Sequence, residues 1–362
     1  MKKPATTSKT FLFESYPEFD NHESVTFIHD ESSGMRGFIA IHNTNIGSAV
    51  GGTRFWYYPN EEEALRDVLR LSRAMTYKCA LAGVPYGGGK AVLMAPEPVS
   101  KLNDAYLAAY AERLNTFDCP FHTGEDVGLS EENVRVLAKR APSCIIGRPE
   151  VGGLPSRWAA LSVFCAMKAA MQESFGSESF ERKTVAIKGL GNVGSELCRL
   201  VSEAGASVIA AEVNAERVRA TKKAFPKIKI VPHLEIATTH ADIYAPCAMG
   251  NEFDEASVPK LSCSIICGAA NNQLASPQVG ALLHGRGILY VPDYVANAGG
   301  LINVVDELHP GGYSRERVET SVGRIRDTVH DIIVQSRTLG LPTSDVADSI
   351  ARKRFAVKKK VV

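Results

Sequence analysis

Residues 184–194 read TVAIKGLGNVG, and this stretch decides the fold of the second half of the chain. The run from Thr184 to Lys188 is short, apolar and β-branched, which is typical of a buried strand. Glycines follow it, and residues 193–204 have helical spacing up to the helix stop at Gly205. A strand, a glycine turn and a helix in this order predict one unit of a parallel sheet.

The three glycines of this turn match the pattern G-x-G-x-x-G. The first allows a tight turn, the second allows close approach of a pyrophosphate, and the third lets helix and strand pack together. Backbone N–H groups and the positive helix end then face the phosphates. The sequence therefore predicts a Rossmann-type dinucleotide site, and it includes these residues: Gly189, Gly191, Asn192, Val193 and Gly194.

Glu212 ends the next predicted strand, residues 207–213. An acidic side chain at this position can accept hydrogen bonds from both ribose hydroxyls and repels a 2′-phosphate. We therefore expect the cofactor to be NAD rather than NADP. The nearby Arg217 and Arg219 are interpreted as a solvated helix face.

Further apolar runs at 242–248, 264–270 and 287–291 recur with the rhythm of βαβ units, so we expect a doubly wound parallel sheet. The first half instead mixes strands with helices. The predicted strands there are 37–42 and 91–94, and the predicted helices are 61–82 and 102–117. Later in the chain we expect a helix at 158–173 and a long helical stretch at 315–337.

Two domains are expected for 362 residues, with a boundary near the glycines and proline of residues 152–155. The first domain is predicted to comprise 1–153, with a C-terminal helical segment, 326–362, packing back on it. Residues 154–325 form the predicted dinucleotide-binding domain.

Composition narrows the classes of function. Forty-one basic against 40 acidic residues give a formal charge of +1, which favours neither nucleic acid nor an anionic membrane as partner. The eight cysteines are scattered without a C-x-x-C pair, so we expect a reduced, cytoplasmic protein without structural metal. The N-terminal residues lack the apolar stretch of a signal peptide, and no apolar run reaches membrane-spanning length, so we expect a soluble chain. The basic run at Lys358–Lys360 is interpreted as a solvated end.

Three polar residues of the first half are candidates for chemistry. Lys90 follows three glycines, whose bare backbone permits close approach of a ligand, and it precedes a buried strand, where loss of solvation favours the neutral amine. Lys78, taken alone, is typical of a surface lysine. Asp126 lies in a glycine-flanked loop and is interpreted either as a functional carboxylate or as a turn or N-cap residue.

The chain resembles the glutamate/leucine/phenylalanine/valine dehydrogenase superfamily. The motifs that carry the resemblance occur in the order of that family: GGTR at 51–54, MTYK at 75–78, PYGGGK at 85–90, TGEDV at 123–127, GLGNVG at 189–194, APCA at 245–248, GAANNQ at 268–273 and PDYVANAGG at 292–300. The resemblance implies an N-terminal α/β substrate-binding and oligomerisation domain, a Rossmann-type doubly wound NAD-binding domain and a cleft between them. It also implies a homo-oligomer that oxidatively deaminates an L-amino acid to a 2-oxo acid and ammonia with NAD, reversibly.

The same resemblance implies residue roles. Lys78 would bind the substrate α-carboxylate, Lys90 would be the catalytic base, and Asp126 would assist proton transfer at the α-amino group. Asn271 would contact both substrate and the nicotinamide ribose, and the turn from Asn297 would border the pocket. The other implied substrate positions are Val50, Gly51, Gly52, Gly124, Ala159, Leu301 and Val304, and the other implied cofactor positions are Cys247, Ala248 and Ala269.

Glutamate-specific members of that family place a lysine and a serine where this chain has Val50 and Val304, so glutamate is excluded as substrate. Aromatic-substrate members resemble this chain at Gly124 and Leu301, and Ala159 replaces the family's threonine. We therefore expect phenylalanine, tryptophan or tyrosine as substrate, with leucine or valine as the alternative.

Two other possibilities stay open at this point. Position 124 is glycine either to make room for an aromatic ring or for reasons of the backbone alone. A non-catalytic NAD-binding homologue is disfavoured because Lys78, Lys90 and Asp126 are all present.

Overall fold

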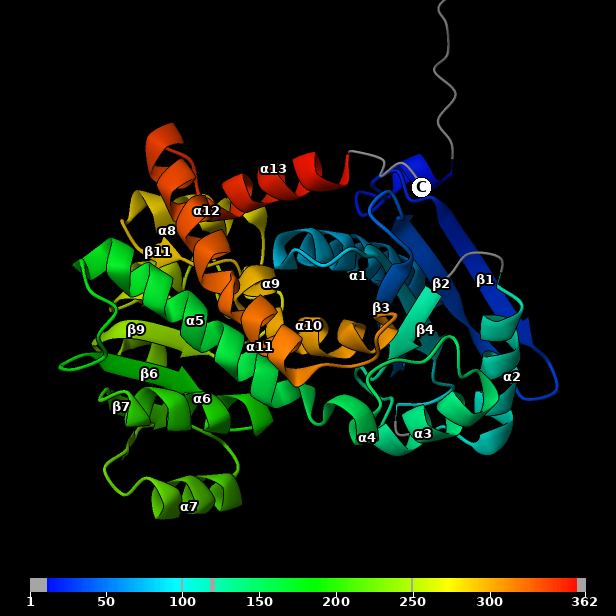
Figure 1. The fold of residues 1–362 in the computed structure, drawn as a ribbon, viewed down its shortest axis with the longest axis horizontal. Helices are drawn as coiled ribbons and strands as arrows, with labels where there is room; N and C mark the ends of the chain where they lie inside the picture. Colours follow the sequence, from blue (N-terminus) through cyan, green and yellow to red (C-terminus); the bar gives the residue numbers. More distant parts are fainter. Residues whose placement is uncertain (1–11, 99, 118–120, 249, 357–362) are drawn as a thin grey trace, which may run out of the picture. The chain divides into compact units, whose positions relative to one another are not determined.

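The computed structural model describes residues 12–98, 100–117, 121–248 and 250–356 (Figure 1). The predicted solvated run Lys358–Lys360 and Cys119 lie outside these residues. Contacts divide the described chain into two units, one with residues up to 76 and 86–146, the other with 77–85 and 147–356. Helix α1, Glu61–Ala82, contributes residues to both.

The first unit is built on a five-stranded mixed sheet with the order β1-β2-β4-β3-β5. Strand β2 pairs antiparallel with β1 and β4, whereas β3 pairs parallel with β4 and β5. Its strands are β1 Ser24–Asp30, β2 Met35–Asn43, β3 Ala49–Trp56, β4 Gly87–Met94 and β5 Phe121–Gly124, and its further helices are η1 Phe13–Ser15, α2 Asp104–Asn115 and α3 Glu131–Arg140. Strands β1, β3 and β5 were not predicted, and in β3 the pair Gly51-Gly52 hides the alternation of a strand.

The two faces of this sheet carry different residues. Ile39 and Leu93 belong to the core that contains Tyr110 of α2, while Ala40 and Val92 pack with Val68 of α1. Because side chains alternate along a strand, Lys90 shares the α1 face with Val92. On β3, Thr53 bonds the hydroxyl of Tyr110, so its neighbours Gly52 and Arg54 face α1 as well.

The second unit contains the predicted parallel sheet, with six strands in the order β11-β10-β9-β6-β7-β8. All its strand pairs are parallel. The strands are β6 Thr184–Lys188, β7 Ser207–Ala211, β8 Lys229–Ile230, β9 Ala241–Pro246, β10 Cys263–Ile266 and β11 Leu289–Tyr290. Ala186, Tyr244 and Ile266 form a core with Leu283 of α8, and the residues alternating with them face α5 and α6. The predicted doubly wound architecture is confirmed.

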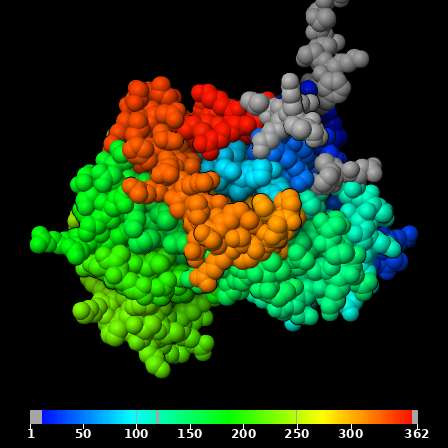
Figure 2. Space-filling view, in the orientation of Figure 1, coloured from blue at the N-terminus to red at the C-terminus, as the bar shows by residue number. Residues whose placement is uncertain are grey.

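The helices of this unit are arranged around α5, Pro155–Phe175, which contacts α6, α10, α11 and α12 (Figure 1). In the space-filling view α12 lies on the surface beside α5 (Figure 2). The other helical segments are α4 Pro149–Gly152, α6 Asn192–Glu203, α7 Ala215–Ala224, η2 Ile236–Thr238, η3 Val258–Lys260, α8 Pro277–Gly285, α9 Asp293–Ala296, α10 Gly299–Val305, η4 Asp306–Leu308, α11 Arg315–Gly323, α12 Ile325–Leu339 and α13 Thr343–Phe355.

The predicted helical stretch 315–337 is helical but consists of two helices, because α11 ends at Gly323 and α12 begins at Ile325. Glycine is a poor helix former and permits this break. The last helices contact the C-terminal end of α1, where Thr328 of α12 and Arg354 of α13 donate hydrogen bonds to backbone carbonyls of residues 80–81.

Two classes of feature are absent from the described part of the chain. None of its helices is long and apolar enough to cross a membrane. It also contains no group of three or more His, Cys, Asp or Glu side chains placed to hold a metal ion.

Candidate active site

Lys90 and Asp126 form a buried ion pair in the first unit. Lys90 Nζ lies 2.7 Å from Asp126 Oδ2, and the lysine side chain is only 7% exposed. Burial raises the pKa of Asp126, but the charges of Lys90 and Arg54 outweigh this effect and hold that pKa below its usual range. The structure thus brings together the two residues that the sequence singled out for proton transfer.

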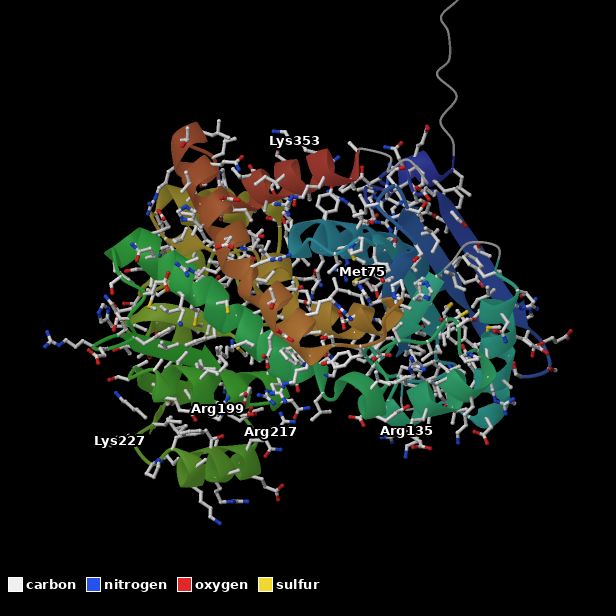
Figure 3. All side chains as sticks on the ribbon, in the orientation of Figure 1. Met75, Arg135, Arg199, Arg217, Lys227 and Lys353 are labelled. Carbon is white, nitrogen blue, oxygen red and sulfur yellow. The ribbon has the colours of Figure 1, made fainter. Side chains whose placement is uncertain are left out.

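Glycines make room for this pair. A Cβ atom at Gly52 would lie 2.8 Å from Asp126 Cβ and 3.2 Å from Lys90 Nζ, so a side chain there would displace both groups. At Gly51 a Cβ would lie 1.8 Å from the Gly89 carbonyl oxygen and 3.2 Å from Cγ of Met75, which Figure 3 labels on α1. The glycine-rich motifs therefore reflect close packing around the Lys90 amine.

Lys78 belongs to a polar group in the second unit. Its Nζ donates to Asn297 Oδ1 over 2.6 Å. Asn297 Nδ2 in turn donates to Asn271 Oδ1 over 2.7 Å and to the Ala269 carbonyl oxygen over 3.0 Å. Sequence reasoning placed Asn297 only at a pocket border, and the structure makes it the residue that joins Lys78 to Asn271.

The dinucleotide motif has the local geometry that its three glycines predict. Gly189 has φ +96°, and a Cβ at Gly194 would lie 1.9 Å from the Gly189 carbonyl oxygen, so strand and helix pack closely there. At Gly191 the nearest atom to a Cβ is Arg217 Nη1 at 3.8 Å, which leaves the approach open. Gly191 also caps α6 without a side-chain hydrogen bond.

These features fit a pyrophosphate at the start of α6, where Asn192 and Val193 are the first two residues. Cys247 and Ala248, which follow β9, pack against the glycine turn. A Cβ at Gly189 would lie 2.9 Å from Ala248 Cβ, and a Cβ at Gly194 would lie 3.2 Å from Cys247 Cβ.

Glu212 is held by backbone N–H groups. Its Oε2 accepts from Leu190 N over 2.7 Å, and its Oε1 accepts from Asn214 N over 2.9 Å. Burial raises the pKa of Glu212, but these donors prevail and lower it below the usual range. Arg217 Nη1 lies 3.9 Å from Glu212 Oε2, so Arg217, interpreted from the sequence as a solvated side chain, lies beside this carboxylate (Figure 3).

The residues predicted to contact the substrate side chain occur in both units. In the first unit Val50 is fully buried, and Gly124 ends β5. A Cβ at Gly124 would lie 2.4 Å from the Ile146 carbonyl oxygen, so the backbone alone requires glycine there. This finding removes position 124 as evidence for a large substrate and supports the alternative left open above.

In the second unit Leu301 and Val304 lie on α10, and Ala159 lies on α5. These two helices contact each other. A Cβ at Gly300 would lie 3.8 Å from Ala159 Cβ, so Ala159 faces α10. Leu301 is buried, at 7% exposure.

Comparison with known proteins agrees with this geometry. Residues 22–142 match the dimerisation domain of the Glu/Leu/Phe/Val dehydrogenases, and residues 152–215 and 211–340 match the glutamate/leucine/phenylalanine/valine dehydrogenase family. The chain belongs to this family. It is an oxidoreductase of the NAD(P)-dependent amino-acid dehydrogenases, as the sequence motifs predicted.

Individual relatives match over nearly the whole chain. Leucine dehydrogenase of Geobacillus stearothermophilus is 40% identical over 95% of this chain and 94% of its own length. L-tryptophan dehydrogenase of Nostoc punctiforme is also 40% identical, over 96% of this chain and 97% of its own. The crystal structure of the Nostoc enzyme matches with a TM-score of 0.83, 39% identity and coverage of 95% of this chain and 98% of that chain. Valine dehydrogenase of Streptomyces albus is 39% identical over 92% of each chain.

Proposed function

We propose that this dehydrogenase catalyses the NAD-dependent, reversible oxidative deamination of an apolar L-amino acid to its 2-oxo acid and ammonia. Aromatic amino acids (phenylalanine, tryptophan or tyrosine) are the proposed substrates. The proposal depends above all on the buried pair of Lys90 Nζ and Asp126 Oδ2, 2.7 Å apart. A lysine and a carboxylate in contact can pass protons in both directions, which deamination and its reverse require.

The residues would act in sequence. The Lys78 ammonium would bind the substrate α-carboxylate. NAD, held by the glycine turn from Gly189 to Gly194, would supply the acceptor for the hydride that leaves Cα. Lys90 takes a proton from water as its oxygen bonds to the iminium carbon, which gives a carbinolamine. Asp126 then relays the proton that Lys90 took up to the amine nitrogen. As the C–N bond breaks and ammonia leaves, the carbinolamine hydroxyl returns a proton to Lys90, and its C–O bond becomes the C=O of the 2-oxo acid.

The substrate class rests on the side chains at the predicted pocket positions. Val50 and Val304 offer no hydrogen bond to a side-chain carboxylate, and burying that group unpaired costs several kcal/mol, which disfavours glutamate. The preference for an aromatic ring now depends on Leu301 and Ala159, since Gly124 is explained by the Ile146 carbonyl.

Leucine or valine is the second candidate. One observation favours it: the backbone explanation of Gly124 removes an argument for an aromatic ring. The nearly equal identities of the chain to leucine, valine and tryptophan dehydrogenases favour neither candidate. Apolar pockets separate such substrates by only about 1–3 kcal/mol per methylene-sized difference, so the margin is expected to be modest.

The cofactor and the assembly are part of the same proposal. Glu212 would accept the ribose hydroxyls of NAD and repel the 2′-phosphate of NADP. The match of residues 22–142 to the dimerisation domain supports a homo-oligomer.

A screen of reduced-cofactor formation with each of the twenty L-amino acids at alkaline pH tests the proposal, with NAD and NADP in parallel. We expect the fastest turnover with an aromatic amino acid and NAD. A clear preference for leucine or valine would select the second candidate. No turnover with any amino acid would refute the function.

A further inference from the structure

Arg54 connects the Lys90–Asp126 pair to a second buried carboxylate. It lies on β3 with its side chain 20% exposed. Its Nε is 3.3 Å from Asp126 Oδ2, and its Nη1 donates to Asp67 Oδ2 over 2.9 Å. One guanidinium therefore spans two carboxylates, a geometry that the planar fork of arginine suits and a lysine ammonium does not.

Asp67 is held in place by residues other than Arg54. The Tyr58 hydroxyl donates to its Oδ2 over 2.6 Å, and Arg70 Nη2 donates to its Oδ1 over 2.7 Å. The Asp67 side chain is 10% exposed, and although burial raises its pKa, these partners and Arg54 lower it below the usual range. Asp67 is thus a fixed, ionised anchor for Arg54.

Arg54 and Lys90 both approach the same oxygen, Asp126 Oδ2. Lys90 must lose and regain its proton in the proposed reaction, whereas a guanidinium stays charged. When the lysine is neutral, the two arginines 54 and 70 still balance the two aspartates 67 and 126. Arg54 therefore keeps Asp126 paired at the stage when Lys90 cannot.

We propose that Arg54 is a positioning residue, which holds the Asp126 carboxylate ionised and directed at the Lys90 amine while Lys90 exchanges its proton. This inference rests on the proposed roles of Lys90 and Asp126. Two further acidic residues lie near Asp126 in the chain: Glu125 precedes it, and Glu131 begins α3. Burial first, and then Glu131 and Asp126, raise the pKa of Glu125. The cations that lower the pKa of Asp126 are Lys90 and Arg54.

The test compares Arg54→Gln with Arg54→Lys and with Arg66→Gln. The last is a matched control, because Arg66 lies on the same helix as Asp67 but pairs with Glu62 and Glu18 instead of Asp67 or Asp126. We expect Arg54→Gln to lower kcat about tenfold or more. The acid limb of kcat/KM should also move to higher pH, because Asp126 loses a cation that lowers its pKa. Arg54→Lys should return the acid limb part of the way to its wild-type pH, and Arg66→Gln should leave the pH profile and kcat unchanged.

Several results would overturn the inference. A wild-type pH profile and kcat in Arg54→Gln, with only a lower Tm, would assign Arg54 a purely structural role. If Arg54→Gln does not fold, Asp67→Asn can replace it, because it weakens the contact that holds Arg54. An unshifted pH profile of kcat/KM in Asp67→Asn would count equally against the inference. A wild-type enzyme inactive with every amino acid would instead refute the proposed function, which separates the two failures.

Discussion

The amide of Asn297 accepts a hydrogen bond from Lys78 Nζ over 2.6 Å and donates one to Asn271, so these three residues form one connected group. The three residues come from the motifs MTYK, GAANNQ and NAGG, and all three lie in the second unit. A lysine ammonium carries three N–H donors and can therefore bind more than one oxygen. It is therefore suited to bind a carboxylate.

Lys78→Ala is expected to act on substrate binding. A charge-assisted hydrogen bond contributes roughly 1.5–3 kcal/mol, so KM for the amino acid should rise about ten- to a hundredfold. Steady-state kinetics measures this, with KM for NAD as internal control. If KM stayed constant while kcat alone fell, the roles of the two lysines would have to be exchanged.

Lys90→Ala is expected to abolish turnover while NAD still binds, because the amine acts in the chemical steps and the dinucleotide motif lies in the other unit. Loss of one acid–base group costs roughly 10²-fold or more in rate. Calorimetric NAD titration beside kinetics separates the two effects. Substantial residual kcat at the pH optimum would remove Lys90 from the mechanism.

Glu212→Gln is expected to lower the ratio of kcat/KM for NAD to that for NADP, about tenfold or more, because the repulsive charge is lost. Glutamine keeps the length and one carbonyl oxygen for the Leu190 N–H. Kinetics with both cofactors measures the ratio. Comparable kcat/KM for the two cofactors in the wild type would already contradict the role of Glu212.

Gly124→Ala is expected to destabilise the fold, because its methyl would meet the Ile146 carbonyl oxygen at 2.4 Å. Overpacking of this kind costs about 1–3 kcal/mol, which a lower Tm would report. Gly285→Ala is the matched control, since no atom lies within 4 Å of a Cβ at that helix end.

Leu301→Val tests the argument that Leu301 favours an aromatic substrate. We expect this variant to lower the ratio of kcat/KM for aromatic amino acids to kcat/KM for aliphatic ones, and an unchanged ratio would refute the argument.

His42 is expected to make the protein less stable in acid. Burial lowers the pKa of His42 from 6.5 to about 4, with contributions from His22 and Arg73. The unfolded chain therefore binds a proton between these pKa values that the folded chain does not. Stability is complete above about pH 6.5 and falls as the pH drops towards 4, by a total on the order of 3 kcal/mol.

His42→Asn keeps a polar partner for Thr76 Oγ1, which lies 2.8 Å from His42 Nδ1, and should flatten the dependence of Tm on pH. His233→Asn, at an exposed histidine, is the control and should leave the dependence intact. An equally steep loss of Tm in His42→Asn would assign the acid sensitivity to other groups.

Local sequence was sufficient for much of the fold. Helix 61–82 and strand 184–188 were predicted with the bounds that the structure has, because a helix or buried strand is encoded by the period of its own apolar residues. The motif at 189–194 likewise predicted its own turn, because the backbone there leaves no room for a Cβ at Gly189 or Gly194. Strand β3 was missed, because glycines stand where its pattern should alternate.

The candidate site likewise has features that the sequence predicted and features that only the structure revealed. The sequence by itself indicated the candidate reactive groups, because Lys90 and Asp126 lie in recognisable glycine-rich segments. Only the tertiary structure decided what stands beside them: Arg54 bridging Asp126 and Asp67, Asn297 joining Lys78 to Asn271, and the Ile146 carbonyl over Gly124. The physical reason is that these partners are distant in the chain and meet through strand pairing and helix packing, which local periodicity does not encode.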